Sequence, residues 1–295
     1  MRVHLVDGTY ELFRQHLAPR PGHQDPAGVE IGGTRSVVQS MLAMLEGGAT
    51  HVGVATDHVI ESFRNDLWET YKTSAGMDPE LLAQFPLLEE ALVALGVAVW
   101  PEVDYEADDA LASAAAVAAA DRRVEQVIIC TPDKDLGQAV GGKVVQLDRR
   151  KDVLLDADGV RAKFGVPPES IPDWLALVGD TADGFPGLPG FGAKTAAALL
   201  ARYGHIEAIP DDPRAWDVPG VRGAERLAVT LNTGRKVAEL FKDLATLRTD
   251  ADVGTVDDWE WRGPRDDFGD WCVRFGWPRL AARAEKLAAS RRGSL

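Results

Sequence analysis

Cysteine and long apolar runs are scarce in this 295-residue sequence. Its two cysteines, Cys130 and Cys272, lie far apart and have no His or Cys neighbours at the spacing of zinc ligands. Cys130 lies in an apolar run, so we expect a buried, reduced thiol and a cytoplasmic protein. No run of about 18 apolar residues is present that could span a bilayer. The N-terminus also lacks the apolar stretch of a signal peptide, so we expect no membrane association.

Positive charge is also in short supply. The chain has 32 Lys and Arg against 46 Asp and Glu, a net charge of −14, and residues 73–121 contain no Lys or Arg. This balance argues against a protein that coats nucleic acid by bulk electrostatics. The argument weakens if the acids surround metal ions, because bound cations reverse the sign of the local field. The positions of the acids therefore decide the question.

Strands alternate with helices in the first half of the chain. We expect strands at residues 3–6, 51–55, 97–100, 126–130 and 144–147, helices at residues 34–45, 86–95 and 107–120, and a turn at Asp7 and Gly8. This order predicts an α/β fold with a mostly parallel sheet flanked by helices. From about residue 170 helices joined by Gly/Pro turns follow, and the Trp residues after position 258 are expected to pack in a core.

Acidic residues gather where ligands bind in such sheets, at the carboxyl ends of the strands. Asp7, Asp57 and the pair Asp133 and Asp135 directly follow predicted strands. A further three acids begin the helix at residue 107, where capping would explain one or two of them. Three acids within four residues repel one another unless a cation lies among them. The last pair, Asp180 and Asp183, would share a helix face if their segment is helical, or lie in a turn otherwise.

Nine carboxylates therefore form one candidate metal set: Asp7, Asp57, Glu106, Asp108, Asp109, Asp133, Asp135, Asp180 and Asp183. Oxygen ligands without His or Cys favour Mg²⁺ or Mn²⁺ over zinc. Two such ions about 4 Å apart can activate a water and stabilise the leaving oxygen of a phosphodiester.

Residues 188–200 have the form of a helix-hairpin-helix turn. Gly190 and Gly192 would let the backbone approach a phosphate, the following helix would offer its N–H groups, and Lys194 would supply charge. The segment is not a P-loop, because Ala193 stands where that motif requires Gly. A purely structural hairpin is the alternative interpretation.

Two cations follow Asp57. Arg64 comes directly after Phe63, and Lys72 directly after Tyr71, so a cation could hold a phosphate and an aromatic ring could stack on a splayed base. Ordinary surface Arg and Lys residues are the alternative interpretation.

These motifs occur together in the order of one known family. Asp7 with Gly8, Asp57, the pairs at 63–64 and 71–72, YEADD at 105–109, PDKDL at 132–136, GD at 179–180 with Asp183, and PGFGAKT at 189–195 follow in sequence. The chain resembles the 5′-nuclease (flap endonuclease) family, which includes the N-terminal nuclease domain of bacterial DNA polymerase I. The resemblance covers roughly residues 1–285. No polymerase portion follows, so we expect a stand-alone bacterial relative.

The resemblance implies a PIN-like nuclease core at residues 1–170, in which residues 73–92 form a helical arch. It further implies a helix-three-turn-helix duplex-binding region at 171–260 and a C-terminal helical segment at 261–295. Compared with the family, the arch is short and acidic, and Thr73 to Ala75 lack a further Arg. Gly184 stands where many members have Asn, a difference that we expect to matter little.

The resemblance also implies an activity: a 5′→3′ exonuclease and flap endonuclease of DNA replication and repair, as in Okazaki-fragment or primer processing, that leaves 5′-phosphates. The nine carboxylates would surround two or three Mg²⁺ or Mn²⁺ ions. Arg64 and Lys72 would contact the scissile phosphate, and Tyr71 would lie near the terminal base. Gly190, Gly192, Lys194 and Thr195 would hold the duplex, with K⁺ bound at the turn. The expected partners of this monomer are DNAs with 5′ flaps, nicks, gaps or free 5′ ends, RNA-primed ones included.

Three other functions compete with this interpretation. A non-catalytic DNA-junction binder would use the hairpin alone, although binding alone would favour loss of acids that repel phosphate. A PIN-type ribonuclease would act on RNA, whereas the hairpin favours duplex DNA. An Asp-nucleophile phosphatase would require a second Asp two residues after Asp7, where Thr9 stands.

Overall fold

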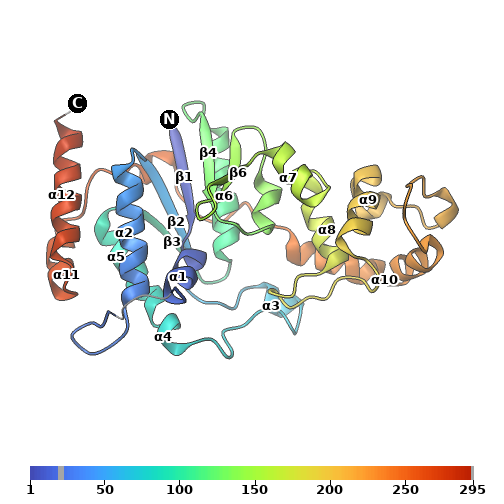
Figure 1. The fold of residues 1–295 in the computed structure, drawn as a ribbon, viewed down its shortest axis with the longest axis horizontal. Helices are drawn as coiled ribbons and strands as arrows, with labels where there is room; N and C mark the ends of the chain where they lie inside the picture. The colour runs from blue at the N-terminus through green and yellow to red at the C-terminus, as the bar shows by residue number, and fades with distance from the viewer. Residues whose placement is uncertain (19–22, 294–295) are drawn as a thin grey trace. The chain divides into compact units, whose positions relative to one another are not determined.

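The computed structural model describes residues 1–18 and 23–293, which divide into two compact units. The first unit comprises Met1–Ile60, Ser74–Thr131 and Thr249–Leu295, and the second comprises Glu61–Thr73 and Pro132–Arg248. Figure 1 shows the elements of both. None of the helices in the described residues is long and apolar enough to cross a membrane.

Four parallel strands in the order β3-β2-β1-β4 form the centre of the first unit. The elements of this unit are β1 (Arg2–Asp7), α1 (Gly8–His16), α2 (Gly32–Glu46), β2 (His51–Asp57), α4 (Pro79–Leu82), α5 (Gln84–Leu95), β3 (Ala98–Glu102), α6 (Ala107–Ala120), β4 (Gln126–Cys130), the 3₁₀ helix η5 (Val256–Trp259), α11 (Phe268–Arg274) and α12 (Pro278–Arg292). The strands are short, largely buried apolar runs, as parallel sheets covered on both faces require. The predicted α/β class is confirmed.

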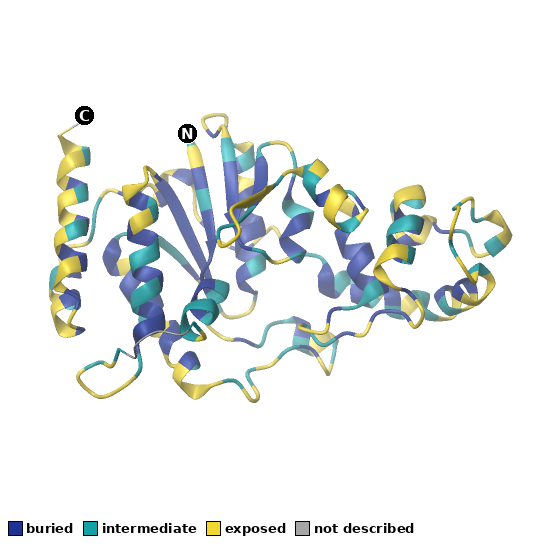
Figure 2. Ribbon diagram, in the orientation of Figure 1, coloured by how far each residue is buried: buried dark blue, intermediate teal, exposed yellow. Residues whose placement is uncertain are grey.

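The second unit is mainly helical. Its elements are α3 (Arg64–Leu67), η1 (Asp135–Ala139), the antiparallel pair β5 (Val144–Asp148) and β6 (Val153–Leu155), α7 (Ala157–Phe164), η2 (Pro168–Ser170), α8 (Ile171–Val178), α9 (Ala193–Tyr203), η3 (Ile206–Ala208), η4 (Pro213–Ala215) and α10 (Ala224–Ala245). Helix α8 is buried along nearly its whole length, dark blue in Figure 2, and packs against α9 and α10. Its apolar residues form the core on which this unit is built.

The predicted turn at Asp7 and Gly8 is wrong, because helix α1 begins directly at Gly8. The Asp7 carboxylate caps this helix by accepting the Tyr10 N–H at 2.8 Å. A Cβ on Gly8 would lie 2.7 Å from the Ala55 carbonyl oxygen, so glycine allows the helix to start against strand β2. The close approach is a tertiary contact that the local sequence does not reveal.

Three of the tryptophans after position 258, Trp259, Trp261 and Trp277, pack in the core of the first unit, as predicted, whereas Trp271 is half-buried. Trp259 and Trp277 are each 1% exposed. The Trp259 ring meets the Trp100 ring edge-on at 5.3 Å, and both indole N–H groups donate to the Val253 carbonyl. This packing joins the segment before α11 to strand β3.

Candidate metal and nucleic-acid site

The predicted carboxylates divide between the two units. Asp7, Asp57, Glu106, Asp108 and Asp109 belong to the first, and Asp133, Asp135, Asp180 and Asp183 belong to the second.

Asp7 and Asp57 end the neighbouring parallel strands β1 and β2, where the sheet places ligands. Both side chains are about nine-tenths or more buried. One Asp7 oxygen accepts the Tyr10 N–H, and the other accepts the Thr131 hydroxyl at 2.8 Å. Asp57 Oδ1 accepts the Ala107 N–H at 2.8 Å, which links strand β2 to the start of helix α6. These bonds fix the orientation of both carboxylates.

The start of helix α6 carries its acids in a capping box. Glu106 precedes the helix, and its backbone N–H donates to the Asp109 carboxylate at 3.0 Å while its own side chain caps the helix in return. Asp109 is completely buried and Glu106 is 4% exposed, whereas Asp108 is half-buried. Capping, which the sequence left as an alternative, therefore does account for Glu106 and Asp109, and it leaves Asp108 without that explanation.

One further acid joins this set that sequence reasoning missed. Glu102 ends strand β3 and is the register partner of Asp57. Burial, together with the carboxylates of Asp109 and Asp57, raises the pKa of Glu102 to about 7. A Glu at the end of a strand is a signal that the sequence does contain. The carboxylates that lie beside Glu102, however, follow only from the order of the strands in the sheet.

The carboxylates of Asp135, Asp180 and Asp183 converge in the second unit. One oxygen from each lies within 4.8 Å of the other two. Asp135 is buried, and burial raises the pKa of its carboxyl well above the usual range, with Asp133 and Asp183 raising it further. Such crowding of like charges is costly unless a cation neutralises it.

Asp135 Oδ1 tests whether a metal ion fits here. This buried oxygen accepts no hydrogen bond from any described residue, and the Lys134 Nζ lies 3.6 Å from it. A buried carboxylate oxygen without a donor, beside two further carboxylates, matches the all-oxygen ligand set that Mg²⁺ and Mn²⁺ prefer. The residues present therefore fit a divalent ion.

Two lysines border this cluster. Lys134 Nζ donates to the Asp180 carboxylate, and Lys72 Nζ lies 3.7 Å from an Asp183 oxygen. Burial alone would lower the pKa of Lys134, but the carboxylates of Asp135, Asp180 and Asp133 together raise it above its usual range. The Lys134 ammonium therefore remains charged and offsets part of the negative charge.

Asp180 and Asp183 lie in a turn and not on a helix face, because helix α8 ends at Val178. The Asp180 N–H donates to the Phe185 carbonyl at 2.8 Å. The N–H groups of Gly184 and Phe185 both donate to the Asp180 carbonyl. The segment before Lys72 docks on this turn, since the Thr70 hydroxyl and the Trp68 indole both donate to the Gly184 carbonyl. The turn thus positions Lys72 beside Asp183.

The expectation that Gly184 matters little is wrong. Its φ is +82°, and a Cβ there would lie 1.9 Å from the Thr70 carbonyl oxygen. Any side chain would push apart the two segments that hold Lys72. Glycine is required here by a contact between residues more than a hundred positions apart.

Arg64 and Tyr71, the other residues predicted to contact substrate, are buried. Arg64 is 1% exposed, and its guanidinium donates to the carbonyls of Leu244 and Thr246 at the end of helix α10. Tyr71 is 3% exposed and packs in the apolar core of the second unit. Both residues hold the Lys72 segment in place, and a direct substrate contact would require them to become uncovered.

The predicted hairpin turn leads into helix α9. Gly190 adopts φ +86°, Gly192 precedes the first residue of the helix, and the Phe191 side chain between them is buried. Gly190, Gly192 and Lys194 are exposed, and Thr195 is half-buried. The first N–H groups of a helix have no partners within it, so this exposed turn presents donors and one ammonium group to solvent. Such a surface suits a phosphate.

A second group of possible ligands, Asp173, His205 and Glu207, was not foreseen. Lys242 Nζ lies 2.9 Å from both Asp173 and Glu207, and His205 Nδ1 lies 2.9 Å from Asp173. The ammonium already neutralises these carboxylates. The cluster is therefore a structural ion-pair network that ties α8 to α10.

Family models identify the chain along nearly all of its length. Residues 2–165 match the 5′-3′ exonuclease N-terminal resolvase-like domain, and residues 166–267 match the 5′-3′ exonuclease C-terminal SAM fold. The chain belongs to the 5′-3′ exonuclease family. The predicted resemblance is confirmed.

Individual relatives agree with this assignment. A 5′-3′ exonuclease of Buchnera aphidicola is 31% identical over 253 residues, covering 84% of this chain and 82% of that protein. DNA polymerase I of Rhizobium leguminosarum is 34% identical over 255 residues, covering 83% of this chain and 24% of that protein. The chain thus spans about a quarter of the length of that polymerase.

A solved structure confirms the fold. The bacteriophage T5 flap endonuclease, in a complex with DNA and metal ions, matches with a TM-score of 0.64 at 18% identity, covering 97% of this chain and 98% of that one. At this identity the match supports the architecture alone. It agrees with the predicted combination of a mostly parallel, PIN-like core and a helical element.

Proposed function

We propose that this chain is a divalent-metal-dependent 5′-nuclease that hydrolyses DNA phosphodiesters at 5′ ends and 5′ flaps and leaves 5′-phosphates. The observation that carries the proposal is Asp135 Oδ1, a buried carboxylate oxygen without a hydrogen-bond donor among the described residues, grouped with Asp180 and Asp183. A nuclease of this family needs such oxygens, and a protein that only bound DNA would gain nothing from burying them.

The nine carboxylates predicted from the sequence are proposed as ligands of two or three Mg²⁺ or Mn²⁺ ions. Direct ligation requires few of them, because Mg²⁺ keeps several waters that the remaining acids can accept. When bound, these ions supply an activated water and stabilise charge on the leaving oxygen. The hydrogen bonds to Asp7 and Asp57 hold those carboxylates in a fixed orientation.

Lys72 is proposed as the cation that contacts the scissile phosphate. Its ammonium already lies at the edge of the carboxylate cluster, within 3.7 Å of Asp183. A phosphate there would accept from Lys72 and from the neighbouring backbone. Arg64 is proposed to act with it by holding the segment, since its guanidinium is committed to the Leu244 and Thr246 carbonyls, and Tyr71 is proposed to lie near the terminal base.

The turn at Gly190 and Gly192, with Lys194 and Thr195, is proposed to bind the duplex backbone and K⁺. Its exposed glycines and helix start offer N–H donors, and its ammonium adds one positive charge. This contact would place the duplex without reading its sequence. The proposed substrates are therefore selected by structure: flaps, nicks, gaps and free 5′ ends, including RNA-primed strands met in replication and repair.

Product mapping on end-labelled DNA tests the proposal. A 5′-flapped duplex is incubated with the full chain in Mg²⁺, in Mn²⁺ and in EDTA, beside nicked, gapped and blunt duplexes. We expect metal-dependent cuts at the flap junction and none in EDTA. Binding of the flap without cutting in either metal would identify a DNA-junction binder, and preferential cutting of an RNA flap on a chimeric strand would identify a ribonuclease.

A further inference from the structure

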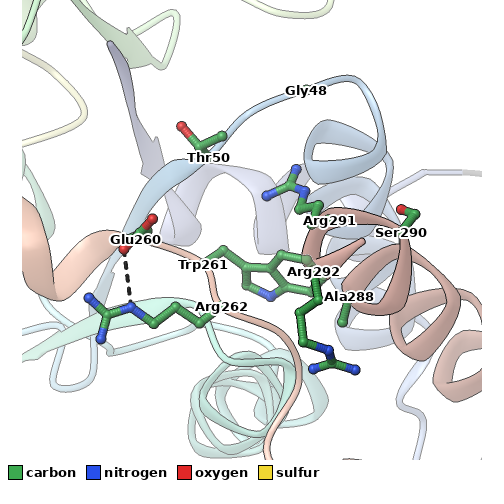
Figure 3. A pocket seen from close by; sticks show the side chains of 9 residues that line it. All are labelled: Gly48, Thr50, Glu260, Trp261, Arg262, Ala288, Ser290, Arg291 and Arg292. Atoms are coloured by element: carbon green, nitrogen blue, oxygen red, sulfur yellow. Dashed lines mark hydrogen bonds and ion pairs between the residues drawn. The ribbon is translucent and has the colours of Figure 1, made fainter. Parts of the chain in front are cut away.

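A cavity of about 540 Å³ lies in the first unit and is unused by the proposed nuclease chemistry. Three segments form its walls: the turn after helix α2, the residues that follow η5, and the last turns of helix α12. Figure 3 shows Trp261 among the side chains of Arg262, Arg291 and Arg292. Its volume falls within the range of about 300–1,000 Å³ that is common for ligand sites.

The cavity lies at the opposite end of the sheet from the carboxylates of this unit. Thr50, which lines it, directly precedes strand β2, and Asp57 ends that strand. At about 3.3 Å per residue these two positions are roughly 20 Å apart. A ligand in the cavity therefore cannot be the phosphodiester that Asp57 serves.

Positive charge gathers here in a chain whose net charge is −14. Three arginines line the cavity against a single acid, Glu260, which bonds Arg262 at 3.1 Å. Arg262 and Arg292 are exposed and can turn toward a ligand. The lining between them is mostly carbon, from Ala288, the Trp261 edge and the arginine stems.

Arg291 and Trp261 form the floor of the cavity, and hydrogen bonds hold both side chains in place before any ligand binds. Arg291 donates to the Leu45 and Ala49 carbonyls at the end of helix α2, and its guanidinium lies 4.9 Å from the Trp261 ring centre. Trp261 is 3% exposed, and its indole N–H donates to the Leu95 carbonyl at 2.8 Å. A rigid floor lowers the entropic cost of binding. Because Arg291 covers the indole face, the floor provides no platform on which a nucleobase could stack.

The surroundings disfavour DNA as the occupant. Protein–DNA interfaces bury about 1,000–2,500 Å² of surface, whereas this is a compact hollow of about 540 Å³. A lone phosphate would contact the arginines but leave the carbon lining empty.

We propose that this cavity binds a short acidic peptide segment of a partner protein. One apolar side chain of the peptide would cover Ala288 and the arginine stems, and one or two of its carboxylates would pair with Arg262 and Arg292. Arginine forms bidentate bonds with carboxylates, and it is enriched where binding energy concentrates at interfaces. The chain's own acidity would keep acidic peptides from binding elsewhere on its surface.

The test measures binding of a fluorescein-labelled peptide by polarisation, using the full chain. The probe is a short Gly/Ser peptide with a central Asp-Asp-Leu-Phe block. Control peptides carry Asn-Asn in place of Asp-Asp, or Ser-Ser in place of Leu-Phe. The double variant Arg262→Glu with Arg292→Glu should weaken binding about tenfold or more. The matched control Arg279→Glu changes the same charge on an exposed position of helix α12 that does not line the cavity.

We expect binding of the intact probe, weaker binding of both control peptides, and unchanged cutting of flapped DNA by every variant. Three results would overturn the proposal. The first is equal binding by the wild type and the double variant, and the second is an equal loss in Arg279→Glu, which would indicate bulk charge. The third is full displacement by a short blunt duplex or by inorganic phosphate with no preference for Leu-Phe, which would indicate a plain anion site.

Discussion

The Lys72 ammonium lies 3.7 Å from an Asp183 carboxylate oxygen, and the Lys72 N–H donates to the Asp183 carbonyl at 3.0 Å. The backbone bond fixes where the side chain starts, while the longer ion pair leaves its end able to move. An ion bound by Asp183 would weaken the ion pair and free the ammonium for a phosphate. This relationship supports the proposal that Lys72 contacts the phosphate of a substrate.

Replacing Lys72 by alanine should therefore lower kcat for flap cutting by about 100-fold, as expected when a preorganised cation is removed from a transition state. Binding of flapped DNA in EDTA should change much less. Lys72→Arg should recover part of the rate, because it keeps the charge but not its geometry. Single-turnover kinetics measure the rate of cutting, and fluorescence polarisation measures the affinity for flapped DNA. An equal loss of rate and affinity would contradict this role.

Asp135→Asn should abolish metal-dependent cutting and leave DNA binding in EDTA intact. The same change should raise the melting temperature of the metal-free protein, because it removes a buried carboxyl whose charged form is disfavoured by burial and by Asp133. Added Mn²⁺ should stabilise the wild type and not the variant. Differential scanning fluorimetry with and without Mn²⁺ measures this.

The control for that experiment is Asp158→Asn, which removes an exposed carboxylate in the first turn of helix α7. It should change neither cutting nor the response to Mn²⁺. If Asp135→Asn instead lowers the melting temperature of the metal-free protein, the carboxylate has a structural partner and the ligand assignment fails.

Gly184→Asn should destabilise the protein by about 2–3 kcal/mol, although asparagine tolerates positive φ better than most residues. The added Cβ would overlap the Thr70 carbonyl oxygen and separate the turn from the Lys72 segment. Chemical denaturation measures the loss, and Gly204→Asn, at φ +77° with open space around its Cβ, provides the matched control. Equal stability of the two variants would show that the Thr70 contact is not tight in solution.

The sheet could be predicted from the sequence because its strands are uninterrupted apolar runs followed by acids. Asp7 and Asp57 were identified by that position alone, and the structure places both at strand ends. Glu102 was missed because its neighbours depend on strand order: it lies beside Asp57 only because β3 pairs with β2. Local pattern carries no information about which strands are adjacent.

Long-range contacts account for the other differences. The requirement for Gly184 arises from Thr70, more than a hundred residues away, and the start of helix α1 at Gly8 depends on an approach to Ala55. Arg64 resembled a surface cation in the sequence, but the end of helix α10 covers it and accepts its hydrogen bonds. Each of these features is set by tertiary packing that overrides the local signal.

Lys194→Ala should weaken duplex binding several-fold and reduce the slope of log affinity against log salt by about one, because one phosphate contact is lost. The rate of cutting at saturating enzyme should fall much less. Lys286→Ala, which removes an exposed charge on helix α12, should leave the slope unchanged. A loss of kcat in Lys194→Ala as large as the loss in Lys72→Ala would argue against a role limited to duplex binding.

The stability of the metal-free protein should fall as pH rises from about 4.5 to about 7, because Glu102 titrates over this interval. Burial and the carboxylates of Asp109 and Asp57 raise its folded-state pKa to about 7 from the ordinary 4.5. A group with a raised pKa favours the folded state fully below its unfolded value and loses that contribution as pH passes the folded value. With solvent screening, the loss in the free energy of unfolding should be on the order of 1–2 kcal/mol.

Urea denaturation in EDTA at several pH values across this interval measures the loss for Glu102. Glu102→Gln should flatten the dependence of stability on pH, whereas Glu125→Gln, a change at an exposed position, should not. A profile as steep in Glu102→Gln as in the wild type would assign the titration to another group, whereas a flattened one would show that Glu102 shares the negative field of Asp57 and Asp109.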